Sequence, residues 1–218
     1  MCLQIAIDGP AGSGKSTISK RLAEELGFIH IDTGAMYRAV TLEALTRNID
    51  LYDEKAYSFL ANTKIHYEND AIFLNNINVS TEIRSYKVTK EVSLVSSHAY
   101  VRKTMVDLQR RAVTGNVVMD GRDIGSHVLP NAQIKIYLTA NVEERARRRY
   151  AELAEAGFNP KFNDVKKEII TRDETDSKRT ESPLVIAKDA LVIDTTYLTI
   201  EEVIKIIKNK INKFKLGE

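Results

Sequence analysis

Cysteine is nearly absent from this sequence, because Cys2 is the only one among 218 residues. A single cysteine excludes an intramolecular disulfide and supplies no set of thiols for a metal, which favours a reducing cytoplasm. There is no run of about 18 or more apolar residues, and no basic region followed by an apolar core at the amino terminus. We therefore expect a soluble, untargeted, cytoplasmic protein with no membrane partner.

An excess of charge of one sign is also missing, since 32 lysines and arginines face 30 aspartates and glutamates for a net charge of +2. This balance gives no general attraction to nucleic acid, so we expect none as a partner. The histidines, His30, His66, His98 and His127, are isolated from one another, and we interpret most of them as ordinary polar or partly buried residues. No long exposed apolar stripe is evident, which predicts a monomer.

A phosphate-binding pattern, G-x-x-x-x-G-K-[ST], follows the apolar run Leu3–Asp8. Its glycines let backbone N–H groups face phosphates, its lysine reaches the outer phosphates, and its hydroxyl is placed for Mg²⁺. The alternative is a glycine-rich turn that merely joins a strand to a helix. We predict that this loop binds ATP with Mg²⁺, the metal being held at Ser16. The nine residues are Gly9, Pro10, Ala11, Gly12, Ser13, Gly14, Lys15, Ser16 and Thr17.

Short apolar runs separated by helical periodicity indicate an α/β fold with a parallel sheet covered by helices on both faces. The length suits one such domain with a small insertion. Thr199 and Glu202 form a capping box that begins a final amphipathic helix. Strands are expected at the beginning of the chain, Phe28–Ile31, Asn116–Met119, Ile134–Leu138 and Leu191–Ile193.

The periodicity changes between Asp50 and about Val88, where apolar and polar residues alternate on either side of Asn69 and Asp70. Alternation with a turn between predicts an antiparallel hairpin. We therefore expect a small antiparallel insertion, bounded by helices over Ala35–Arg47 and Ala99–Thr114.

Charged residues gather where two predicted strands end, and ligands of open α/β sheets bind outside such ends. Asp32–Arg38 follows the second strand, where Arg38 could hold a second phosphate; alternatively Asp32 or Thr33 only caps a helix. Asp120–Gly125 follows another strand, where an aspartate can orient Mg²⁺-bound water and Arg122 can clamp a phosphate. The alternative there is a tight turn with a surface ion pair.

Two predicted helices also carry arginines on one face. Arg145, Arg148 and Arg149 would repel one another without a bound anion, although pairing of Glu143 with Arg147 on a solvated face is the alternative. Arg172, Asp176 and Arg179 share a face of a helix that stops before Pro183, either as ligand contacts or as a stabilising ladder.

A phosphate-binding loop names a ligand and not a reaction. Arginines from several distant segments that converge on one crevice fit two anionic ligands held end to end, and phosphoryl transfer needs mainly alignment and charge stabilisation. Two readings stay open beside a nucleotide kinase. One is a kinase for another acceptor such as AMP, UMP or shikimate, and the other is a nucleotide-dependent switch that hydrolyses ATP slowly.

Taken together, the motifs resemble those of bacterial cytidylate kinases, in the same order and over nearly the whole chain. They are Ile7–Thr17, Asp32–Arg38, Asp120–Asp123 and the R-D-x-x-D-x-x-R pattern of Arg172–Arg179. The resemblance implies transfer of the ATP γ-phosphoryl group to CMP or dCMP. It also implies a P-loop core over 1–34, 100–150 and 163–218, a monophosphate-binding domain over 35–99 that includes the insertion, and a lid over 151–162.

The same resemblance implies roles for individual side chains. Lys15, Arg38, Asp120, Arg122 and Arg179 would be catalytic, with Arg38 and Arg122 at the acceptor phosphate and Asp120 beside them. Arg148 would contact ATP from the lid side. The substrate-binding set would be completed by Thr33, Arg102 and Asp123 at the cytosine, by Ser93, Arg172 and Asp176 near the sugar, by Arg179 between base and phosphates, and by Tyr37. Thr33 stands where the family often has serine, and the hydroxyl is kept.

Overall fold

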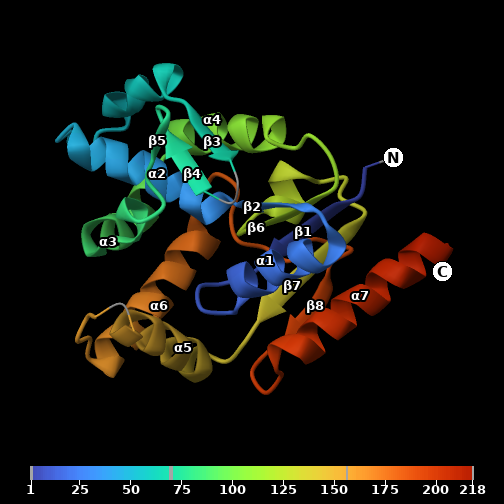
Figure 1. Ribbon diagram of the computed structural model, residues 1–218. Helices are drawn as coiled ribbons and strands as arrows, with labels where there is room; N and C mark the ends of the chain where they lie inside the picture. Colours follow the sequence, from blue (N-terminus) through green and yellow to red (C-terminus); the bar gives the residue numbers. More distant parts are fainter. Residues whose placement is uncertain (1, 69–70, 156, 218) are drawn as a thin grey trace.

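A five-stranded parallel sheet forms the centre of the computed structural model, which describes residues 2–68, 71–155 and 157–217 (Figure 1). Its strand order is β2-β6-β1-β7-β8, and each neighbouring pair is parallel. The predicted parallel α/β sheet is thereby confirmed. The strands are β1 (Gln4–Asp8), β2 (Ile29–Asp32), β6 (Val117–Gly121), β7 (Ile134–Thr139) and β8 (Leu191–Asp194).

Alternate residues of the central strand enter two separate cores, one on each face of the sheet. Ile5 and Ile7 pack with helices α1 (Lys15–Leu26) and α7 (Ile200–Leu216), whereas Ala6 packs on the side of α2 (Thr33–Thr46) and α4 (Ala99–Arg111). A strand that is buried on both faces has a continuous run of apolar residues, and such runs predict these strands in the sequence. The predicted capping box of α7 is present, with Thr199 accepting from the Glu202 backbone.

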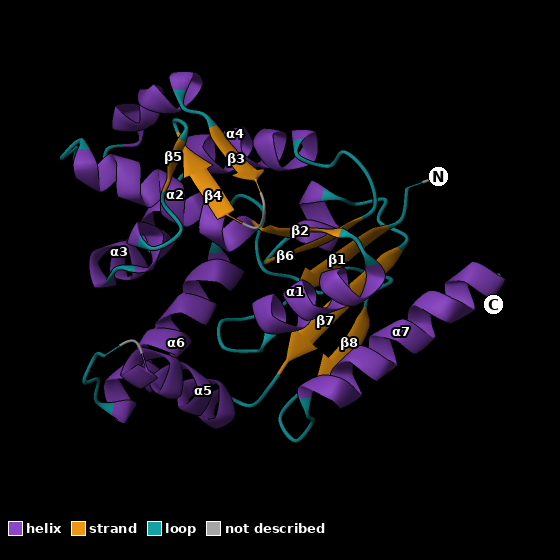
Figure 2. Ribbon diagram, in the orientation of Figure 1, coloured by secondary structure: helices purple, strands orange, loops and turns teal. Residues whose placement is uncertain are grey.

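The insertion lies beside this core and differs from it in pairing (Figure 2). Its strands β3 (Ile65–Glu68), β4 (Ala71–Leu74) and β5 (Ile77–Asn78) form an antiparallel sheet, which confirms the predicted hairpin and adds a short third strand. The turn expected at Asn69–Asp70 lies outside the described residues. Two 3₁₀ segments, Glu54–Asn62 and Glu82–Arg84, and helix α3 (Tyr86–Val95) complete the insertion.

Helices α5 (Val142–Glu155) and α6 (Phe162–Lys178) pack against each other through Ala146, Val165 and Ile169. The predicted lid over 151–162 therefore begins as the end of α5 and includes position 156, which is not described.

Arg179 follows α6 in extended backbone, so its assignment to the helix is wrong. Its side chain donates to the Ser182 carbonyl at 2.7 Å instead.

None of the helices within residues 2–68, 71–155 and 157–217 has the length and apolar character needed to cross a bilayer.

Candidate functional site

The glycine-rich loop between β1 and α1 is packed so closely at two positions, Gly9 and Gly12, that there is no room for a side chain there. A Cβ atom at Gly9 would lie 2.0 Å from the Leu138 carbonyl oxygen, and one at Gly12 would lie 2.7 Å from the Arg145 carbonyl oxygen. Both glycines also have positive φ values, 150° and 74°. The loop is therefore held against β7 and α5 in a conformation that only glycine adopts without strain.

Lys15, in the first turn of α1, is folded back over this loop and buried. Its Nζ donates to the Pro10 carbonyl at 2.7 Å and lies 3.4 Å from Ser13 Oγ. Burial, followed by the nearby positive charge of Arg122, lowers the pKa of Lys15 well below its ordinary value of 10.5. An anion bound in the loop would oppose both effects, because it stabilises the charged ammonium group.

Asp120, near the end of β6, joins three elements at the carboxyl edge of the sheet. Ser16 Oγ donates to its Oδ2 at 2.9 Å, His30 Nε2 lies 2.8 Å from its Oδ1, and Thr33 Oγ1 donates to its backbone carbonyl at 2.8 Å. The hydroxyl and the carboxylate are oxygen donors of the kind that Mg²⁺ takes in proteins.

Asp32 pairs in register with Asp120 on the neighbouring strand. Burial, and then the charge of Asp120, raises the pKa of Asp32 above its ordinary value. Asp32 also accepts from the Ala35 backbone N–H at 3.0 Å, so the alternative of a helix cap is correct for this residue. Thr33, in contrast, turns its hydroxyl toward β6.

Three arginines and two aspartates alternate along one buried chain of contacts. Arg122 Nε donates to Asp176 at 2.8 Å, Arg179 Nη1 lies 3.3 Å from the same carboxylate, Arg179 Nη2 lies 3.7 Å from Asp123, and Arg102 Nη2 donates to Asp123 at 2.6 Å. The Asp123, Asp176 and Arg179 side chains are at most 5% exposed. The alternative of a surface ion pair at Asp120–Gly125 is therefore wrong, whereas Asp176 and Arg179 do form an ion pair of the kind that the stabilising-ladder alternative describes, at i,i+3.

Two further arginines at this edge form no ion pair with any described carboxylate. Arg38 donates to Thr89 Oγ1 at 2.8 Å, and burial together with the charge of Arg149 lowers its pKa to about 10. Burial and the charge of Arg122 lower the pKa of Arg172 to about 9, and its Nε is buried without a partner. The edge therefore holds more positive charge than its own carboxylates balance.

The remaining predicted residues make other contacts or lie on other elements. The guanidinium of Arg102 stands over the Tyr37 ring at 5.3 Å, and Ser93 is half-buried on α3. Arg148 donates to the Thr195 carbonyl at 2.7 Å, and its Nη1 would lie 3.7 Å from a Cβ at Gly14. Arg148 thus borders the glycine-rich loop.

The α5 arginines are held individually. Arg145 contacts the Ala11 carbonyl at 3.0 Å and Asp173 at 2.5 Å, and Arg149 pairs with Glu152. The alternative pairing of Glu143 with Arg147 does not form. Arg147 pairs with Glu144 instead, at i,i+3, while Glu143 pairs with Lys166 of α6, because α6 packs beside this end of α5.

Sequence reasoning missed two residues of the site, Asp8 and His30. Asp8 accepts from the backbone N–H groups of Ile124 and Gly125, each at 2.7 Å, and so fixes the turn that follows β6. Its position at the carboxyl end of the first strand was an available signal. His30 contacts Asp120, which is 90 residues away in the sequence. The spacing of the histidines relative to one another gave no sign of this contact.

Comparison with known proteins gives one family. The model of the cytidylate kinase family matches residues 5–213. The chain is 52% identical over 209 residues to a cytidylate kinase of Alkaliphilus oremlandii, covering 95% of this chain and 96% of that protein, and 49% identical over 213 residues to one of Acholeplasma laidlawii, covering 97% and 96%. A shikimate kinase structure from Acinetobacter baumannii, in complex with shikimate, aligns with a TM-score of 0.53, 15% identity and 99% and 96% coverage, which shows a shared fold.

The buried carboxyl group of Asp8 makes the unfolding free energy of the protein depend on pH. Burial is the largest effect and raises its pKa from 3.8 to about 6. The folded chain therefore keeps a proton that the unfolded chain releases, so this stabilisation is complete below about pH 4 and is lost as the pH rises past about 6. We expect the unfolding free energy of the wild type to fall over this interval, relative to Asp8→Asn, by on the order of 3 kcal/mol.

Urea unfolding at closely spaced pH values measures this difference. Asp107→Asn, at an exposed position on α4, controls for the loss of one negative charge. A constant difference between wild type and Asp8→Asn from pH 4 to 7 would contradict the assignment to Asp8.

Proposed function

Because the chain belongs to the cytidylate kinase family, we propose that this site transfers the γ-phosphoryl group of ATP to CMP or dCMP, giving CDP or dCDP and ADP. The observation that carries the proposal is the placement of two kinds of anion-binding group at one sheet edge. The glycine-rich loop with Lys15 stands at one side of it, and the buried chain of arginines and aspartates from Arg122 to Arg102 stands at the other.

On the donor side, the loop backbone and Lys15 bind the ATP phosphates. The Nζ of Lys15 leaves the Pro10 carbonyl for the outer phosphates, which are better partners for a buried ammonium group. Arg148, which borders the loop, contacts ATP. Closure of the lid over 151–162 excludes water that would otherwise hydrolyse the donor.

Magnesium fits the oxygens of Ser16 and Asp120. No cluster of three or more His, Cys, Asp or Glu side chains suited to a metal occurs in the described residues, and Mg²⁺ commonly binds through few protein ligands, waters and substrate phosphates. When bound there, the ion would neutralise charge on the transferring phosphates. Ser16 would be its protein ligand, and Asp120 would orient its water.

On the acceptor side, Arg38 and Arg122 hold the monophosphate in line with the donor. A phosphate monoester has a second pKa of about 6 and is largely ionised at neutral pH, so the attacking oxygen needs no strong base. Arg179 adds positive charge between the base and the phosphates. Catalysis is therefore mainly alignment and charge stabilisation.

The nucleoside occupies the part of the site beyond these phosphates. Thr33, Arg102 and Asp123 read the cytosine edge, since the ion pair of Arg102 with Asp123 fixes a donor and an acceptor in a buried position. Tyr37 supports Arg102 from below. Ser93, Arg172 and Asp176 lie toward the sugar. The enzyme has a P-loop core over 1–34, 100–150 and 163–218 and a monophosphate-binding domain over 35–99, and it acts as a cytoplasmic monomer.

A panel of acceptors tests the function. ADP formation is measured with CMP, dCMP, UMP, AMP, shikimate and no acceptor, each with ATP and Mg²⁺. CMP and dCMP are expected to give the highest kcat/KM and to raise ATP consumption strongly above the level without acceptor. Turnover that is independent of acceptor would support a nucleotide switch, and preference for AMP, UMP or shikimate would name a different kinase.

Replacement of Arg122 tests the acceptor site. Arg122→Ala is expected to lower kcat/KM for CMP at least about tenfold, or about 1.4 kcal/mol, because the acceptor phosphate loses a charged partner. Arg111→Ala, at the exposed end of α4, serves as the control and keeps wild-type kinetics. Steady-state kinetics with varied CMP decides the point, and unchanged kcat/KM in Arg122→Ala would remove this residue from the site.

Replacement of Asp123 tests base recognition. Asp123→Asn is expected to reduce the ratio of kcat/KM for CMP to that for UMP more than it reduces turnover, because an amide offers both a donor and an acceptor to the base. A ratio within one sample is independent of how much of the variant is folded, which matters because Asp123 pairs with buried Arg102. An unchanged preference among the bases would refute this role.

A further inference from the structure

The carboxylate of Asp120 is held at both of its oxygens by side chains from two different elements. Ser16, on α1, donates to Oδ2 at 2.9 Å, and His30, on β2, lies 2.8 Å from Oδ1 through its Nε2 atom. Because an ionised carboxylate only accepts hydrogen bonds, His30 is the donor in this contact. The side chains of His30 and Asp120 are 15% and 3% exposed, so neither carries the solvation of a surface pair.

The local backbone explains why Asp120 needs a second partner. Asp32 lies opposite Asp120 in register on the adjacent strand, and His30 precedes Asp32 by two residues, so His30 and Asp32 are on the same face of β2. Two neighbouring carboxylates repel each other and favour rotation of one of them away. A donor on Oδ1 opposes that rotation and keeps Oδ2 directed at Ser16.

We propose that His30 is a positioning residue for phosphoryl transfer, acting through Asp120 to hold the Asp120–Ser16 pair at the donor phosphates. This inference rests on the proposed function, because that function gives Ser16 and Asp120 their task. The role assigned to His30 requires no contact with either nucleotide. Its effect is on the orientation of a carboxylate that does act at the site.

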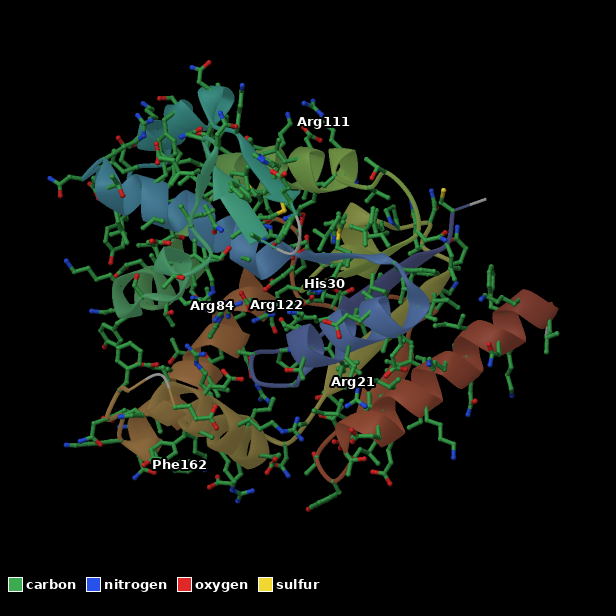
Figure 3. All side chains as sticks on the ribbon, viewed as in Figure 1. Arg21, His30, Arg84, Arg111, Arg122 and Phe162 are labelled. Atoms are coloured by element: carbon green, nitrogen blue, oxygen red, sulfur yellow. The ribbon has the colours of Figure 1, made fainter. Side chains whose placement is uncertain are left out.

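A small pocket beside His30 lies between the core and the insertion. The pocket measures about 100 Å³, and His30 shares its lining with Lys20, Asp32, Tyr67 and Arg84. In Figure 3 the labelled His30, Arg84 and Arg122 lie near the middle of the view. Water from this pocket can solvate Oδ1 when the imidazole is removed, but mobile water does not fix the rotation of the carboxylate.

The test compares side chains that can and cannot donate at the Nε2 position. His30→Leu lacks a donor, whereas His30→Gln places an amide N–H near the former Nε2. We expect His30→Leu to lower kcat about tenfold with the KM for CMP within about twofold, and His30→Gln to recover most of the loss. His66→Gln is the matched control, because His66 is exposed and stacks on Phe73.

A double-mutant cycle asks whether the effect passes through Asp120. In an Asp120→Asn background, His30→Leu is expected to change kcat by less than about twofold, since the carboxylate that it orients is gone. Fully additive losses would overturn the proposal, as would wild-type kcat in His30→Leu or an equal loss in His30→Gln. If His30→Leu does not fold, His30→Asn, whose amide is too short to reach Oδ1, takes its place.

Calorimetry provides a readout that a folding defect does not move. The ratio of ATP affinity with Mg²⁺ to ATP affinity without Mg²⁺ is measured for the wild type and the His30 variants. His30→Leu is expected to lower this ratio about fivefold or more, and an unchanged ratio would overturn the proposal. If the wild type fails to phosphorylate CMP, the proposed function is wrong, and this ratio still decides whether His30 orients the Asp120–Ser16 pair.

Discussion

Crowding of positive charge at the carboxyl edge of the sheet is the constraint on which the rest of the site depends. Half-buried Arg122 and the buried side chains of Arg179 and Arg102 lie close together, which is tolerable only because Asp176 and Asp123 alternate with them. Buried charges without partners are expensive, and breaking one such pair leaves an uncompensated charge behind. The alternation therefore holds these three arginines in place before any ligand arrives, so that they need little reorganisation on binding.

The parallel sheet makes this arrangement possible because its strands all end at the same edge. Asp32, Asp120 and Asp8 lie at or near the ends of three adjacent strands, in the order β2, β6 and β1. They are nevertheless used differently. Asp32 caps α2, and Asp8 accepts from the backbone of the turn after β6, so both stabilise the local fold. Asp120 alone of the three turns a carboxylate oxygen toward a hydroxyl of the glycine-rich loop.

Features encoded by local pattern could be predicted from the sequence, and features that depend on distant register could not. The glycine-rich loop, the buried strands and the Thr199 capping box are local, and the structure confirms each of them. The partner of Asp8 is 116 residues away and that of His30 is 90 residues away, so no spacing rule connects them. Glu143 pairs with Lys166 of α6, and Arg147 pairs with Glu144. The sequence of α5 alone could not indicate this, because the packing of α6 beside α5 decides it. Roles of individual site residues stay predictions, since they depend on bound nucleotides.

The positive charge without carboxylate partners is concentrated in one part of the sheet edge, which suits it to bind phosphates. Arg102, Arg122 and Arg179 each pair with a carboxylate, whereas Lys15 and Arg38 contact only neutral oxygens and Arg172 has no ion-pair partner among the described residues. The last three come from the glycine-rich loop, α2 and α6, and burial, followed by nearby positive charge, lowers the pKa of each. The free protein thus keeps an electrostatic cost in one place, as active sites commonly do. A ligand that brings phosphates to that place relieves the cost, whereas an uncharged ligand would leave it unchanged.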